Sequence, residues 1–187
     1  GYYCQKLVPH QANRYDGMYD WGGALQCDLP YMRLADIYLM YAEAGAAVQG
    51  ANYKSNKCNL TAVDAINVLR DRVEAGHVAD KYAANQQKFM DEVRRERAVE
   101  LAFEGFRWND LQRWLLLTEY PYNIKTSQEF KRVGNYDFTK KDPRDAEVTC
   151  WSEKTILTRD FSEKHYLLPL KQSDVYLYPE FGQNPGW

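Results

Sequence analysis

Residues 30–44 read PYMRLADIYLMYAEA, and this stretch decides the fold class. Apolar side chains recur in it at helical spacing, at Tyr31, Leu34, Ala35, Tyr38, Tyr41 and Ala42. The spacing predicts an amphipathic helix from about Leu29 to Val48. Asp28 suits its N-cap and Pro30 its first turn, while Gly50 is a stop signal.

Three further helices are predicted downstream. Thr61 and Asp64 have the spacing of a capping box before an apolar stripe at Ala62, Ala65, Ile66, Leu69 and Val73. A third helix is expected from near Asn85 to Phe103, and a short aromatic one from Trp108 to about Leu117. The chain is therefore predicted to be mainly α, with two helical pairs.

The first two predicted helices match the spacing of a tetratricopeptide repeat. Tyr31, Leu34, Ala35 and Tyr38 fit the pattern of its first helix, and Ala62 and Ile66 fit that of the second. The polar insertion between them makes the unit about 15 residues longer than a standard repeat. One repeat cannot bury its own apolar faces. Either the other helices supply the packing, or further repeats lie outside this sequence.

The remaining segments carry turn formers and little periodicity. We expect a single domain over residues 1–187, with a helical core at 29–117, a loop-rich segment at 118–163 and an extended tail at 164–187. Short strands are expected around Lys154–Leu157. The long irregular segments are expected to wrap the helical core.

Composition narrows the function classes. The 187 residues carry 24 Lys+Arg against 26 Asp+Glu, so no basic footprint for nucleic acid is present. No apolar run approaches the ~20 residues of a membrane span. The start of the chain lacks the basic and apolar regions of a signal peptide, which favours a mature or truncated chain. Aromatic residues make up 14% of the sequence and suit a protein that buries or displays flat apolar surfaces.

Cysteine and histidine spacing predicts neither a metal site nor a cofactor. Cys4, Cys27, Cys58 and Cys150 form no CxxC motif, and His10, His77 and His165 are isolated from one another. If the protein is exported, two disulfides are compatible with the sequence in any of three pairings. The Cys27–Cys58 pairing is disfavoured, because the predicted helix separates these residues by ~30 Å.

Several segments together resemble the C-terminal portion of the SusD/RagB family of outer-membrane nutrient-binding lipoproteins. In chain order they are residues 30–44, 65–72 (AINVLRDR), 95–97 (RER), 100–107 (ELAFEGFR), 110–111, 113–114, 166–170 (YLLPL) and 183–187 (QNPGW). Asp36 stands where the family usually has Glu. Residues 1–28 and 118–163 carry little of the family pattern.

The resemblance implies a SusD-like α-superhelical fold and non-catalytic binding of a glycan or other oligomeric nutrient. It implies a surface-exposed place on the outer membrane and delivery of the nutrient to a SusC-like TonB-dependent transporter. By the same resemblance, the chain is a fragment of a longer protein whose N-terminal part carries a lipid anchor. A tetratricopeptide-type protein-interaction module and, less favoured, a glycan-cleaving enzyme are the alternatives.

A cluster of charged residues offers the strongest candidate for chemistry: Glu96, Arg97, Glu100, Glu104, Arg107, Asp110 and Arg113. A glycosidase needs a carboxyl pair across a sugar-sized cleft. The preferred interpretation is a structural ion network, because carboxylates alternating with arginines stay ionised and make poor general acids. No catalytic residue is therefore assigned.

Trp21 and Trp151 are the candidate ligand contacts, because both fall outside the helical periods and exposed rings suit the apolar faces of sugars. Other aromatic residues are assigned to packing: Tyr31, Tyr38, Tyr41, Trp108, Trp114 and Trp187. No ligand contact is carried over from the family, since many of its contacts lie in loops outside this stretch.

Overall fold

The computed structural model describes residue 6 and residues 30–135 and 147–187. The chain divides into two compact units. The helical unit contains residue 6 and residues 30–107, and the C-terminal unit contains residues 108–135 and 147–187. Each unit is described by itself below.

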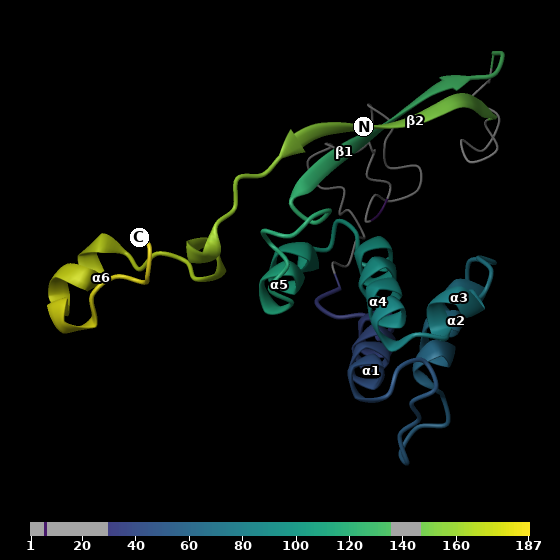
Figure 1. Cartoon of the computed structure of the whole chain (residues 1–187), viewed down its shortest axis with the longest axis horizontal. Coiled ribbons are helices and arrows are strands. Elements are labelled where there is room, and N and C mark those ends of the chain that lie inside the picture. Colours follow the sequence, from purple (N-terminus) through teal and green to yellow (C-terminus); the bar gives the residue numbers. More distant parts are fainter. Residues whose placement is uncertain (1–5, 7–29, 136–146) are drawn as a thin grey trace, which may run out of the picture. The chain divides into compact units, whose positions relative to one another are not determined.

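The helical unit is built from α1 (Leu34–Val48), α2 (Ala62–Asp71), α3 (Asp80–Ala83) and α4 (Gln86–Glu100). Helix α1 packs against both α2 and α4, and the short α3 packs against α4 (Figure 1). Helix α5 (Phe106–Arg113) begins in this unit and continues into the next. The prediction of a mainly helical chain is confirmed.

Helix α1 begins later than the sequence suggested. Its N-cap is Arg33, whose backbone is extended at φ −119° and ψ 154°, so the prediction of Pro30 in the first turn is wrong. Tyr31 is 96% exposed and Leu34 is 66% exposed, so neither packs in the core of the chain. The predicted cap, Asp28, lies outside the described residues.

The buried face of α1 also differs from the apolar stripe that the sequence predicted. It consists of Ala35, Asp36, Leu39, Ala42, Gly45 and Ala46. Spacings of three and four residues place these side chains on one side, rotated from the predicted stripe. A Cβ atom on Gly45 would lie 2.8 Å from the Cβ of Ala62 and 2.8 Å from Cδ1 of Tyr53. The glycine is what lets α1 approach the start of α2 so closely.

Helix α2 begins with the predicted capping box. The Asp64 amide donates to Oγ1 of Thr61 at 3.2 Å, and the Thr61 amide donates to Oδ2 of Asp64 at 2.9 Å. Four of the five predicted stripe residues are buried, namely Ala62, Ala65, Ile66 and Leu69. The helix ends at Asp71, which leaves Val73 62% exposed.

The main core of the helical unit lies where α1, α2 and α4 meet. It contains Ala42, Ala46, Ala51, Ala62, Ala65, Ile66, Val78, Phe89 and Val93. Tyr41 packs against its edge and also holds the polar insertion, since its hydroxyl donates to the Leu60 carbonyl at 2.7 Å and accepts from the Ser55 amide at 3.0 Å. These bonds, together with the packing of Tyr53 against Gly45 and Tyr41, tie the insertion to α1.

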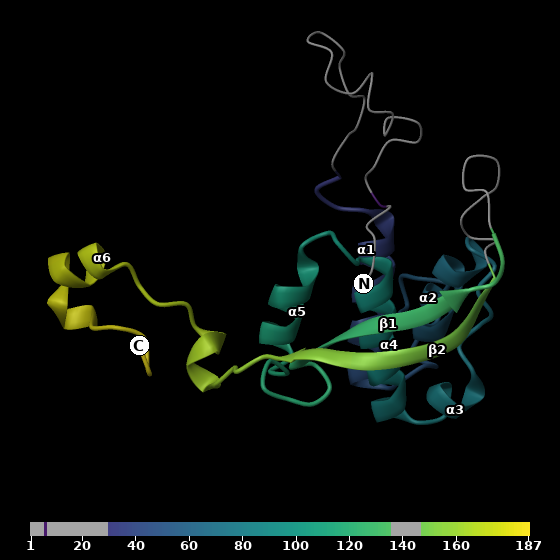
Figure 2. The same ribbon diagram turned by 90° about the horizontal axis from the view of Figure 1, so that it is seen from above.

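The C-terminal unit contains an antiparallel hairpin of β1 (Ile124–Arg132) and β2 (Val148–Thr158), drawn as a twisted ribbon in Figure 2. The register shifts after Lys125 and again between Glu129 and Lys131. The predicted short strand around Lys154–Leu157 lies inside β2, but most of this segment had been predicted to be loop. Every residue of β2 is exposed, so no buried face imposes an apolar alternation on its sequence.

The tail contains short helical turns rather than a continuously extended chain: η2 (Glu163–Tyr166), α6 (Gln172–Leu177) and η3 (Pro179–Phe181). Trp187 fixes its end, because the indole Nε1 donates to the carbonyls of Lys164 at 3.0 Å and Leu167 at 2.9 Å. The Lys164 ammonium lies 4.4 Å from the centre of the same ring. Among the described residues, no helix combines the length and apolar character needed to cross a membrane.

Candidate functional site

Many charged residues of α4 form ion pairs with neighbouring parts of the helical unit. Glu92, Glu96 and Glu100 follow one another at four-residue spacing, so they lie along one side of the helix. Their partners come from α2 and its C-cap Arg72, from the segment before α1, and from Arg95 of α4 itself. The pairs fall into three groups along the helix.

The first group centres on Arg70 of α2. Its Nη2 donates to Oε1 of Glu92 at 2.5 Å and to Oε2 of Glu96 at 2.7 Å. Arg95 completes the group through two bonds of 2.8 Å to the carboxylate of Glu92. Because Glu92 and Glu96 are buried, these contacts supply the hydrogen bonds that a buried charge requires. They fix α2 against α4.

The second group is a buried pair between α4 and α1. Nη1 of Arg97 donates to Oδ1 of Asp36, and the two side chains are 5% and 4% exposed. The ring of Phe106 lies 5.4 Å from the guanidinium carbon. Asp36 therefore has a structural role in the first helix.

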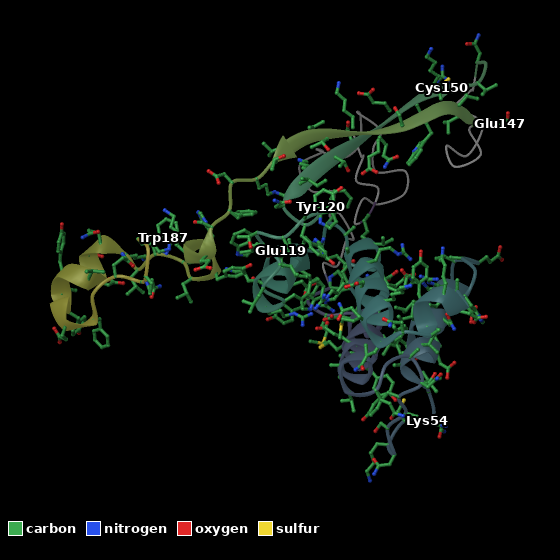
Figure 3. The ribbon with its side chains drawn as sticks, in the orientation of Figure 1. Lys54, Glu119, Tyr120, Glu147, Cys150 and Trp187 are labelled. Carbon is green, nitrogen blue, oxygen red and sulfur yellow. The ribbon has the colours of Figure 1, made fainter. Side chains whose placement is uncertain are left out.

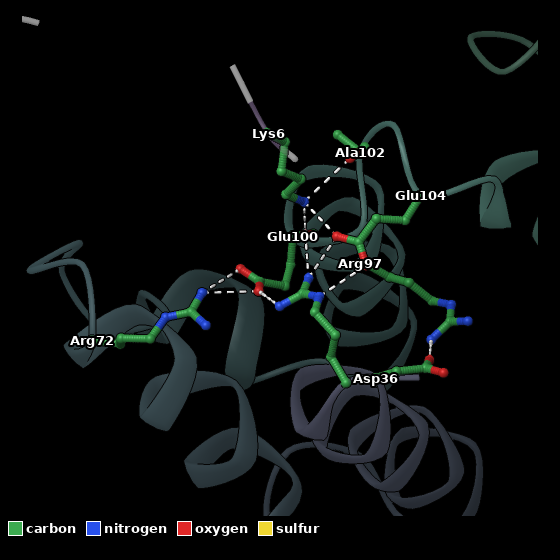
Figure 4. A network of polar contacts seen from close by, with 8 residues as sticks. Lys6, Asp36, Arg72, Arg97, Glu100, Ala102 and Glu104 are labelled. Atoms are coloured by element: carbon green, nitrogen blue, oxygen red, sulfur yellow. Dashed lines mark hydrogen bonds and ion pairs between the residues drawn. The ribbon is translucent and has the colours of Figure 1, made fainter. Parts of the chain in front are cut away.

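The third group gathers at the C-terminal end of α4 (Figure 4). Arg33 makes a two-bond contact with the Glu104 carboxylate, at 2.8 and 2.7 Å, and its Nη1 donates to Glu100 at 2.9 Å. Arg72 donates to both carboxylate oxygens of Glu100 at 2.8 and 2.9 Å. Lys6 donates to Oε1 of Glu104 and to the carbonyls of Glu100 and Ala102. Basic side chains thereby satisfy carbonyls that the helix end leaves unpaired.

These contacts lower the pKa values of Glu92, Glu100 and Glu104 and so keep these three carboxylates ionised. Burial raises the pKa of Glu100, but hydrogen bonds from Arg72 and Arg33 outweigh it and hold the pKa below its ordinary value. The pKa of Glu104 is likewise raised by burial and lowered further by Arg33 and Lys6. Hydrogen bonding from Arg95 is the main reason that the pKa of Glu92 is lowered.

The lowered pKa values predict acid sensitivity. A carboxyl whose pKa is lower in the folded state stabilises the fold above its unfolded value of 4.5, and this stabilisation is lost as pH falls through the folded pKa. We expect the free energy of unfolding to decline below pH 4.5 in urea titrations followed by circular dichroism. The double variant Glu100→Gln, Glu104→Gln should be less stable at neutral pH and show a shallower decline. If the free energy of unfolding falls with the same slope in the unmodified chain and in the double variant, Glu100 and Glu104 are not the source of the acid sensitivity.

The remaining predicted cluster residues lie on α5. Nε of Arg113 donates to Oδ1 of Asp110 at 3.0 Å, and Asp110 is buried in the C-terminal unit. Arg107 lies in the first turn of the same helix, at the end of the helical unit. Arg33, Arg70 and Arg72, which bind the glutamates, were missed because charge alone does not reveal a partner distant in sequence.

The described part of the chain holds no group of three or more His, Cys, Asp or Glu side chains that could bind a metal. His77 pairs with Asp71 at 2.8 Å on the surface, and Nδ1 of His165 accepts from the Ser162 amide at 2.9 Å. His10 lies outside the described residues. Cys58 and Cys150 are free thiols, and Cys4 and Cys27, whose pairing the sequence leaves open, lie outside the described residues.

The tryptophans differ in their surroundings. Trp151, in β2, is 63% exposed beside Cys150, which is labelled in Figure 3. Trp21 lies outside the described residues. Trp108 packs on Phe161 with ring centres 5.5 Å apart, and Trp114 lies 4.8 Å from the Arg113 guanidinium carbon. Trp151 is therefore the described tryptophan with the most open ring face.

A sequence model described as the SusD family matches residues 1–187, the whole of this chain. The chain belongs to the SusD family. Its ion pairs, helical core and closing tryptophan are thus features of a SusD-family chain. Among curated proteins, no sequence match is found.

Two solved structures are similar to this SusD-family chain. A SusD-like protein from Bacteroides fragilis NCTC 9343 is 24% identical with a TM-score of 0.63, and the match covers 90% of this chain. A second structure, named BT4246, is 25% identical with a TM-score of 0.59 over 86% of this chain. The chain spans only 28% and 24% of the lengths of these two proteins.

Proposed function

We propose that this chain serves in non-catalytic capture of a glycan or other oligomeric nutrient at the surface of the outer membrane, for delivery to a SusC-like TonB-dependent transporter. The match to the SusD family over residues 1–187 is the observation that carries the proposal. Within that role, the helical unit is a rigid support, held by three groups of ion pairs. Binding is left to exposed rings and polar side chains.

The state of the glutamates supports binding rather than cleavage. Glycoside hydrolysis needs one protonated carboxyl as general acid, held opposite a second carboxyl across the sugar. Glu92, Glu100 and Glu104 instead have lowered pKa values and bind arginine. A carboxyl fixed in this way donates no proton at neutral pH.

Trp151 provides the testable ligand contact. Its exposed ring can stack on the apolar face of a sugar, so Trp151→Ala is expected to weaken glycan affinity about three- to tenfold. A glycan array screens for the ligand, and calorimetry of the best hit measures the loss. Tyr176→Ala removes another exposed ring, on α6, and should leave affinity unchanged. Equal affinities of the two variants for the glycan would exclude Trp151 as a contact. An array without any bound glycan would contradict glycan capture.

A protein-interaction module is the second candidate, favoured by one observation on α1. Leu34, Ile37 and Met40 are 66%, 45% and 40% exposed at three-residue spacing, which makes an apolar stripe on the helix surface. Saturable peptide binding that is lost in Ile37→Asp, together with no glycan binding, would favour this function over nutrient capture.

A further inference from the structure

A pocket of about 390 Å³ lies in the helical unit between α3 and α4. Its lining residues are Lys81, Tyr82, Lys88, Asp91, Glu92 and Arg95. The volume falls within the roughly 300–1,000 Å³ of small-molecule sites. On α4, Lys88, Asp91 and Arg95 follow at intervals of three and four residues, so one helix face carries them toward the same space.

The charges of this pocket do not cancel. Glu92 is already bound by Arg70 and Arg95, which donate to its two oxygens. No carboxylate among the described residues pairs with Lys81 or Lys88, although both line the pocket. Oδ1 of Asp91 accepts hydrogen bonds from Gln87 and Arg94. Both are 3.3 Å long, which is near the upper limit for a hydrogen bond. The pocket lining therefore contains two lysines that have no carboxylate partner among the described residues, and one carboxylate with long contacts.

Tyr82 gives the pocket an aromatic wall. Its ring is half-buried against the main core, which fixes its position. The Lys81 ammonium lies 4.8 Å from the centre of this ring. A ligand in contact with the ring thus meets a positive charge beside an apolar surface. Such a wall suits the C–H face of a sugar, and the charge suits an acidic substituent.

We propose that this pocket binds an acidic sugar residue of the hexuronate class. The lysines, Lys81 and Lys88, take the carboxylate, Asp91 takes hydroxyl groups, and Tyr82 takes the C–H face. A neutral sugar would use the ring and Asp91 but would gain nothing from the two ammonium groups. The inference rests on the proposed function of glycan capture and adds the chemical class of the ligand.

Calorimetry of the chain with trigalacturonate and with neutral galactotriose tests the inference. We expect trigalacturonate to bind more tightly, with an affinity that falls as salt is raised. Lys88→Met should weaken trigalacturonate binding about tenfold, the effect of one charged hydrogen bond, and Lys81→Met should act in the same direction. Lys57→Met removes the same charge from the exposed insertion and should have no effect. Circular dichroism checks that each variant is folded.

The outcomes separate this inference from the proposed function. Binding of trigalacturonate that is unchanged in both Lys88→Met and Lys81→Met, or equal affinity for the two trisaccharides, would overturn the acidic-sugar pocket. If the glycan array finds only neutral ligands, the pocket assignment also fails while glycan capture stands. If no glycan binds at all, glycan capture fails together with the pocket assignment.

Discussion

Replacing Arg97 with methionine is expected to lower the free energy of unfolding of the helical unit by about 3–5 kcal/mol. The variant would leave the carboxylate of Asp36, whose side chain is 4% exposed, buried without the Arg97 guanidinium. A buried charge without compensation costs far more than the pair contributes when intact. Chemical denaturation followed by far-ultraviolet circular dichroism measures the loss, because this signal reports on the helices.

Two further variants make this prediction specific. Arg72→Met breaks an ion pair of the same kind at a side chain that is 52% exposed, and it should cost no more than about 1 kcal/mol. Adding Asp36→Leu to Arg97→Met removes the stranded carboxylate and should recover much of the lost stability. If Arg97→Met lowers the free energy of unfolding no more than Arg72→Met does, burial of the Asp36–Arg97 pair does not increase its effect on stability.

Phe89→Ala is expected to destabilise the helical unit by about 3–5 kcal/mol through the cavity it creates. Among the described residues, Phe89 is the largest side chain with zero exposure, and it joins α4 to the core formed with α1 and α2. The same denaturation experiment measures the effect. Phe130→Ala removes the same ring from an exposed position in β1, and it should change stability by less than about 0.5 kcal/mol. Equal effects would contradict the placement of Phe89.

Local signals predicted the helices best. The capping box at Thr61 and Asp64 and the apolar stripe behind it are both determined by residues within four positions, so α2 could be read directly. The third helix was also placed well, because Asn85 caps α4 through its side chain at 2.9 Å from the Lys88 amide. The alternation of arginine and glutamate in α4 indicated an ion network. It did not indicate which distant arginines pair with the glutamates.

Features that depend on distant contacts were not predicted. Arg33 is extended and binds Glu100 and Glu104 about 70 residues away, so the start of α1 depends on a contact that no local pattern encodes. The β1–β2 hairpin was missed for a different reason. Its strands are largely exposed, so no buried face requires apolar and polar residues to alternate in the sequence. The α3–α4 pocket combines residues whose joint exposure becomes visible only in three dimensions.

Capture without cleavage is tested most directly by recovering a bound oligosaccharide and measuring its mass. The chain is incubated with the best array ligand, and the released sugar is analysed by mass spectrometry. The account predicts saturable binding and an oligosaccharide of unchanged length, with the same result for Glu96→Gln and Glu100→Gln. Shorter products with new reducing ends, absent from either of these variants, would contradict it.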